Sequence, residues 1–377
     1  MLTLRARRLF DGHDLLEDRV VHIQDGKIVE VTAGGSADVD LGDVMLLPGF
    51  IDCHVHLAFD AGLDPVASLD RPGLADRMRE AARAHLRAGV TTVRDLGDRE
   101  YLALRLGLGV AEGPDILAAG PPLTSKGGHC WWLGGEVGGE EGIREAVREH
   151  HRRGVHAIKM MVTGGQMTEG SQPHLTQFTL EEIKAAADEA HACGLPIAGH
   201  AHGGEGIAFA VAAGFDTIEH CAFWTEHSAE PDLAVIAEIA ASSTIVSLTA
   251  GLIPVEGVAP PPDLLERLPK LIEVMQLLYR GGVKWTIGTD AGIAPVKPHG
   301  MIGHGAKMLV GLGYAPLDVL RAITATAAAA CRVEDRKGRI AAGYDADLVA
   351  VSGDPLSDIT ALLAPFAVYH RGERVAL

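Results

Sequence analysis

Residues 48–57, PGFIDCHVHL, combine a Pro-Gly turn, a short apolar strand and two histidines at the end of that strand. Residues i and i+2 of a strand lie on the same side, so His54 and His56 are expected to point in one direction. Seven later segments are similarly apolar and rich in β-forming residues; they are 90–97, 115–123, 156–165, 196–203, 217–223, 243–250 and 284–292. The sequence therefore predicts eight strands.

Helical patterns separate these strands. Stretches such as 75–89, 144–154 and 180–194 carry apolar residues at three- and four-residue spacing and end in glycine. Such an alternation favours one (β/α)8 TIM barrel, here over residues 47–337, rather than a doubly wound sheet. The strand-like segments 1–46 and 338–377 are expected to form a small composite β-sandwich domain, so the predicted fold class is α/β.

Composition and charge narrow the functional classes. The 377-residue chain has a net charge of −17, which makes it a poor partner for nucleic acid or an anionic membrane. No apolar run is long enough for a transmembrane helix, no signal peptide is recognised, and the five cysteines show no CxxC spacing. We expect a cytoplasmic homo-oligomer that acts on a small molecule.

Polar residues stand near the ends of five predicted strands. In a TIM barrel functional residues lie at the carboxyl ends of the strands, where these side chains would face one cavity. Each residue taken alone is more simply a hydrogen-bonded structural residue, but a shared cation explains the whole set. Imidazole and carboxylate ligands suit zinc, with manganese, iron, cobalt and nickel as alternatives. The set comprises His54, His56, Lys159, His200, His202, His220 and Asp290.

Lys159 needs a separate explanation because an ammonium ion would be repelled by metal ions. Burial and nearby cations lower the pKa of a lysine and favour the neutral amine. A neutral amine can take up carbon dioxide to form a carbamate, whose two oxygens could bridge two metal ions.

The motifs PGFIDCHVHL, AIKMMVTGG, AGHAHG, IEHCAF and GTDAG resemble those of the amidohydrolase superfamily of metal-dependent hydrolases. Over nearly the whole chain, the sequence looks most like the branch that holds imidazolonepropionase-like proteins and metal-dependent Xaa-Pro or Xaa-Arg dipeptidases. The resemblance implies two divalent ions, with zinc favoured, and a carbamylated Lys159 that bridges them.

The resemblance also implies individual roles. His54 and His56 would bind the more buried ion, and Asp290 would bind metal and shuttle the proton. His200 would be the strand-5 ligand and His220 the strand-6 ligand. His202 would then face the substrate, although an exchange of roles between His200 and His202 stays open.

One segment departs from the dipeptidase pattern. Where that branch tends to carry a GGHG loop after strand 3, this chain has SKGGHCWWLGGEVGG (125–139), with two indoles after His129. A tryptophan offers a rigid stacking face, so Trp131 and His129 are expected to contact the substrate together with His202. Packing of one indole against the barrel is an equally good alternative.

The predicted reaction is hydrolysis of a C–N amide or peptide bond by a metal-bridging hydroxide, with a dipeptidase- or carboxypeptidase-like substrate as one option. Asp290 would act as base and then acid, and His220 and His129 complete the catalytic set. One alternative is a mononuclear cyclic-amide hydrolase or deaminase, in which Lys159 is structural. Others are a lactonase or phosphotriesterase on the same barrel, and a non-catalytic scaffold.

Overall fold

The computed structural model describes residues 1–110, 112–259 and 262–377, and its α/β organisation agrees with the sequence prediction. Parallel strands in its central part coincide with all eight predicted segments. They are β6 (Phe50–Val55), β7 (Val90–Asp95), β8 (Asp115–Ala118), β9 (Ile158–Met161), β10 (Ile197–Gly203), β11 (Thr217–Trp224), β12 (Ile245–Leu248) and β13 (Trp285–Ile287).

The parallel strands form two sheets in chain order. One sheet contains β6, β7 and β8, and the other runs from β9 to β13. Parallel bridges join the two sheets at both sides, between Leu123 and Met160 and between Val55 and Ala291. The carboxyl ends of all these strands therefore lie at the same edge of the array.

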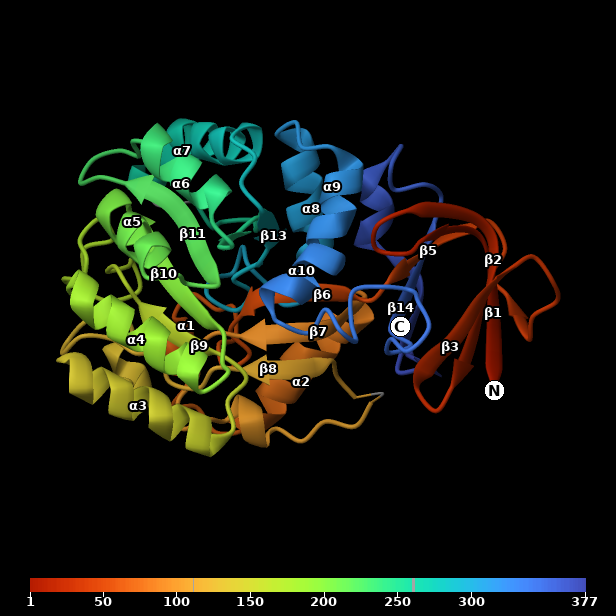
Figure 1. Ribbon diagram of the computed structural model, residues 1–377, viewed down its shortest axis with the longest axis horizontal. Coiled ribbons are helices and arrows are strands. Elements are labelled where there is room, and N and C mark those ends of the chain that lie inside the picture. Colours follow the sequence, from red (N-terminus) through yellow and green to blue (C-terminus); the bar gives the residue numbers. More distant parts are fainter. Residues whose placement is uncertain (111, 260–261) are drawn as a thin grey trace.

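Helices cover the outside of the parallel strands (Figure 1). They are α1 (Pro65–Ser68), α2 (Leu74–Arg87), α3 (Glu140–Arg153), α4 (Leu180–Ala192), α5 (Gly204–Ala212), α6 (Leu233–Ala241), α7 (Pro262–Arg280), α8 (Ile302–Gly311), α9 (Pro316–Ala322) and α10 (Ala325–Ala330). The sequence pattern did not predict α8, whose segment contains several glycines and therefore has a low helix propensity. Among the described residues, no helix is both long and apolar enough to cross a membrane.

Local signals delimit the helices on either side of β9, the strand that carries Lys159. α3 ends at Gly154, which adopts a left-handed conformation that favours glycine. α4 begins with a capping box, in which the Thr179 hydroxyl accepts from the Glu182 amide and the Glu182 carboxylate accepts from the Thr179 amide. The chain enters β9 shortly after Gly154, and α4 begins after the loop that follows β9.

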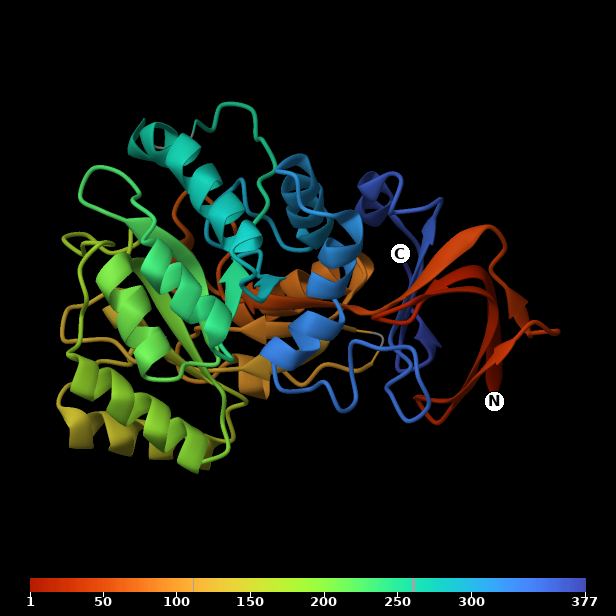
Figure 2. The ribbon, with the colours of Figure 1, turned by 45° about the horizontal axis from the view of Figure 1, so that its top comes forward.

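The two ends of the chain form a second region. Its strands are β1 (Leu2–Phe10), β2 (Leu15–Gln24), β3 (Lys27–Ala33), β4 (Val39–Asp40), β5 (Val44–Pro48), β14 (Leu348–Ser352), β15 (Pro365–His370) and β16 (Glu373–Arg374). β5 pairs in parallel with β1 and antiparallel with β14, so the terminal strands make one continuous sheet rather than the two sheets of a sandwich. Figure 2 shows these red and blue strands together on one side of the molecule.

A buried charge cluster links this terminal sheet to the parallel strands. Lys337 is 2% exposed, and its Nζ lies 2.8 Å from Asp115 at the start of β8. The same Nζ lies 2.6 Å from Asp347, just before β14, and 3.1 Å from Asp345. Burial alone would lower the pKa of Lys337, but Asp347 and Asp115 outweigh it and raise the pKa. The lysine is therefore held as a cation among three carboxylates.

We predict that Lys337→Met lowers the free energy of unfolding by about 3–5 kcal/mol, because it removes the buried cation that contacts Asp347 at 2.6 Å. Chemical denaturation followed by circular dichroism measures the loss. Lys270→Met is the matched control, since Lys270 pairs with Glu273 at the surface and should contribute little to stability. Equal losses in the two variants would contradict a special role for the buried cluster.

Candidate metal centre

One group of acceptor atoms lies at the junction of β6 and β13. The Nε2 atoms of His54 and His56 are 3.2 Å apart, and Oδ1 of Asp290 lies 3.5 Å from the first and 3.3 Å from the second. All three side chains are buried. The Asp290 amide donates to the His54 carbonyl at 2.7 Å, which holds the aspartate beside the histidine pair.

The protonation of these groups follows from their other contacts. Nδ1 of His54 lies 2.9 Å from Oε2 of Glu219, and Nδ1 of His56 lies 3.3 Å from the Gly97 carbonyl oxygen. Each oxygen can accept a proton from the Nδ1 that faces it, and in that tautomer both Nε2 atoms offer lone pairs. Burial lowers the pKa of His54 to about 4, so its ring is neutral at pH 7.

Asp290 adds a third acceptor without a proton. Burial alone would raise the pKa of this carboxyl, but His54 and His56 outweigh burial and lower it, so the group is ionised. Two imidazole lone pairs and a carboxylate that point at one another in a buried space repel unless a cation lies between them. The residues present thus fit a divalent metal ion with nitrogen and oxygen ligands.

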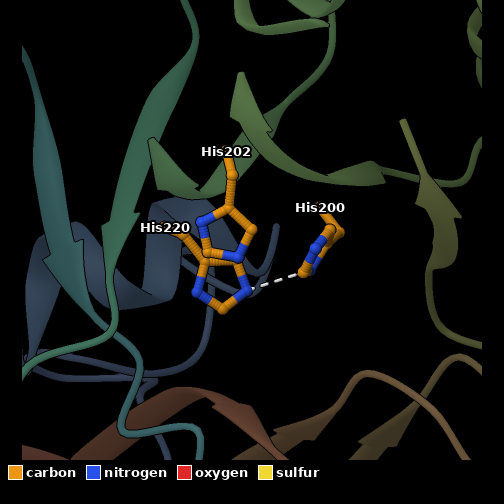
Figure 3. Close-up of side chains that lie close together, drawn as sticks. All are labelled: His200, His202 and His220. Atoms are coloured by element: carbon orange, nitrogen blue, oxygen red, sulfur yellow. Dashed lines mark hydrogen bonds between the residues drawn. The ribbon is translucent and has the colours of Figure 1, made fainter. Parts of the chain in front are cut away.

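A second group contains His200, His202 and His220, from β10 and β11 (Figure 3). Nε2 of His220 lies 3.0 Å from Nδ1 of His200, and the rings of His202 and His220 stack with their centroids 4.4 Å apart. Nε2 of His200 donates to the Gly164 carbonyl at 3.1 Å, which leaves Nδ1 of His200 as an acceptor. One nitrogen of each residue lies within 4.8 Å of the others, so the geometry allows both His200 and His202 as ligands.

Backbone strain accompanies two of these side chains. His220 has φ +70° and Asp290 has φ +59°, a left-handed conformation that is uncommon outside glycine and often found at functional sites. Gly288 allows the approach of β13 to β6, since a Cβ at this position would lie 2.4 Å from Cβ of His54. The turn IGTDAG thus needs glycine to place Asp290 at the site.

Lys159 lies in the same cavity as both groups. It is 1% exposed, and its Nζ has no hydrogen-bond partner among the described residues. Burial lowers the pKa of Lys159 to about 8, which makes the neutral amine accessible near neutral pH. A buried amine without a partner, beside two groups of metal-ligand atoms, fits the carbamate inferred from its chemistry.

Of the three residues expected to contact substrate, two line the cavity and one does not. His129 and His202 line the cavity, and the ring of His129 lies 4.7 Å from that of His200. Trp131 is 46% exposed and is not among the described residues that line the cavity. Its neighbour Trp132 packs against Phe59 with the ring centroids 5.9 Å apart, which agrees with the alternative that an indole holds the loop to the strands.

Two further buried residues were not singled out in the sequence. Oε1 of Glu219 accepts from the Arg94 guanidinium at 2.9 Å and from the Thr217 hydroxyl at 2.6 Å, while Oε2 faces His54. Burial would raise the pKa of Glu219, but Arg94 and His54 lower it overall. Glu219 therefore orients His54 as an ionised carboxylate. The sequence does contain a signal for these two residues, because each is a charged residue within an otherwise apolar strand: Arg94 in VTTVRDLG and Glu219 in TIEHCAF.

All the metal-ligand candidates, together with Lys159 and His129, line one cavity of about 430 Å³ at the carboxyl ends of the parallel strands. The cavity brings together two groups of donor atoms, a neutralisable amine and an ionised carboxylate. This combination can bind metal ions and move a proton next to them.

Comparison with known proteins supports the same conclusion. The model of the Amidohydrolase family matches residues 45–371. Ochratoxinase from Aspergillus niger is 28% identical over 369 residues, which cover 86% of this chain and 74% of that protein. Imidazolonepropionase from Aliivibrio salmonicida is 24% identical, with 89% and 87% covered.

A solved structure is also similar. The crystal structure of a Xaa-Pro dipeptidase with bound methionine in the active site has a TM-score of 0.87 and 27% identity, and the match covers 100% of this chain and 99% of that one. These findings confirm the resemblance seen in the motifs. The chain belongs to the amidohydrolase family and is an enzyme that hydrolyses carbon–nitrogen bonds.

Proposed function

We propose that this enzyme hydrolyses an amide bond of a small molecule with the help of two divalent metal ions, zinc being favoured. His54, His56 and Asp290 would hold one ion, and His200 and His220 the other. A carbamylated Lys159 would bridge the two. The observation that carries this proposal is the convergence of imidazole nitrogens and a carboxylate in a buried cavity.

The proposal includes the architecture around the site. The parallel bridges at both sides of the two sheets support a closed (β/α)8 barrel. We assign the barrel to residues 47–337 and the composite β domain to residues 1–46 and 338–377. We still expect the protein to be a cytoplasmic homo-oligomer.

Metal ions bound here would polarise the substrate carbonyl and lower the pKa of a water molecule toward about 7. The ionised Asp290 takes a proton from the attacking water as its oxygen bonds to the carbonyl carbon. Asp290 then gives this proton to the departing nitrogen as the C–N bond breaks. The products are a carboxylic acid and an amine.

Other side chains position the substrate and the residues that react with it. Burial lowers the pKa of His129 to about 3, so its ring is neutral and can donate one N–H to the oxyanion beside His200 and His220. His202 lies over His220 and faces the substrate. Trp131 is left out of the proposal because its ring lies outside the cavity. Glu219 and Arg94 keep His54 in the required tautomer and orientation.

Metal analysis combined with a substrate panel tests the proposal. Two equivalents of a divalent ion per chain, together with turnover of amides that stops on chelation, are expected. One equivalent at full activity would favour the mononuclear alternative. Faster turnover of lactones or phosphotriesters than of amides would favour those reactions instead.

We predict that Asp290→Asn retains bound metal but lowers kcat by about 10²–10⁴-fold, because an amide cannot accept the proton from water. Steady-state kinetics with elemental analysis of the same sample measures both effects. Wild-type turnover in a metallated variant would remove Asp290 from the proton path.

We predict that Lys159→Ala loses bound metal and activity, and that added short carboxylic acids restore part of both by replacing the carbamate oxygens. Lys184→Ala is the matched control, since Lys184 is an exposed lysine on α4. Normal metal content and activity in Lys159→Ala would exclude the bridging role.

A further inference from the structure

One face of α7 forms an apolar wall of the cavity. Leu264, Leu268, Leu271 and Met275 follow one another at four-, three- and four-residue spacing, so they share one side of the helix, and all four line the cavity. Leu268 is 37% exposed, and the other three are partly buried. A row of large apolar side chains that the protein itself leaves partly uncovered marks a binding surface for apolar groups.

Apolar side chains from other elements extend this wall toward the metal-ligand residues. Trp224 at the end of β11 lines the cavity, and its ring lies 4.9 Å from that of His202. Met167, Ile293 and Val296 line the cavity as well. An apolar group bound along α7 can therefore belong to the same small molecule as an amide carbonyl that lies beside the metal-ligand histidines.

The basic side chains around this cavity are already engaged. Among the described lining residues, the basic ones other than histidine are Lys159 and Lys297. Lys159 belongs to the metal-ligand groups, and Nζ of Lys297 donates to the carbonyls of Thr249 at 3.0 Å and Thr289 at 2.9 Å. Arg267, which lies over Trp224, donates to backbone carbonyls of Thr225, Ser228 and Glu226.

The cavity also offers few acidic side chains to a positively charged substrate group. Asp290 is the one carboxylate among the described lining residues, and it faces His54 and His56. A zwitterionic dipeptide that extends from the metal-ligand residues along α7 would bury its carboxylate or its ammonium group against the apolar wall. Burying charges without partners is costly, so the cavity disfavours such a substrate.

We propose that the substrate is an uncharged amide with a bulky aryl or branched alkyl group, and that this group packs against Leu268, Leu271 and Met275. This inference rests on the proposed amide hydrolysis and adds the substrate class. Water cleaves the amide into a carboxylic acid and an amine, and the apolar group leaves with one of them.

A matched substrate pair tests the charge requirement. Hippuryl-L-phenylalaninamide and hippuryl-L-phenylalanine offer the same amide bond between glycine and phenylalanine, and they differ by the terminal carboxylate. Release of hippurate, measured by liquid chromatography with the metallated enzyme, should give a kcat/KM at least about tenfold higher for the uncharged compound. An equal or higher value for the charged compound would overturn the substrate class and leave amide hydrolysis standing.

A variant on α7 tests the position of the apolar group. Leu268→Asp should raise KM for hippuryl-L-phenylalaninamide about tenfold or more, with kcat and metal content nearly unchanged. Leu268→Ala should raise KM by a smaller factor, and Glu266→Gln, at an exposed α7 position outside the cavity lining, should leave KM unchanged. Unchanged KM in both Leu268 variants, with folding verified by circular dichroism, would overturn the assignment of the wall.

Failure of the amide reaction itself has a different signature. If the metallated wild-type enzyme releases hippurate from neither compound and cleaves no amide of the wider panel, the proposed function fails, and the substrate class fails with it. Cleavage of amides with no preference between the paired compounds overturns the substrate class alone.

Discussion

The site depends on one electrostatic constraint: acceptor atoms brought this close together repel one another unless a proton or a cation lies between them. Glu219 and the Gly97 carbonyl face the Nδ1 atoms of His54 and His56, and with protons held there both Nε2 lone pairs point at ionised Asp290. At His200 the arrangement is reversed: Nε2 donates to the Gly164 carbonyl, and Nδ1 is left as the acceptor. Packing around these side chains stabilises an arrangement that a cation completes, as metal sites require.

The charge cluster between the terminal sheet and β8 also holds acceptor atoms close together, but there a lysine lies between them. Asp115, Asp347 and His370 also bring ligand atoms within 4.8 Å of one another, as a metal site would. There the protein supplies its own cation, because Nζ of Lys337 contacts both carboxylates. At the strand ends the corresponding lysine is Lys159, whose pKa is lowered to about 8, so that a neutral amine is more accessible than in a free lysine. This difference distinguishes the buried ion network from the proposed metal site.

Polar and apolar functions are divided within the cavity. In the proposed function the strand ends provide the metal-ligand atoms and the proton acceptor, while α7 and Trp224 provide apolar surface. Strands positioned by backbone hydrogen bonds suit the demanding geometry of metal ligands. The contacts along α7 are non-directional, so this wall can distinguish substrates by size and polarity without affecting the ligands.

The sequence by itself determined the strands, the family and the metal-ligand candidates. Strand alternation is a local property, so the spacing of His54 and His56 and the polar ends of apolar segments were sufficient. Only the tertiary structure decided that Arg94 and Glu219, 125 residues apart, support His54, that Trp131 lies outside the cavity and that α7 forms its wall. Local periodicity says which side of an element is apolar or polar, but contacts between distant segments depend on how those elements pack together.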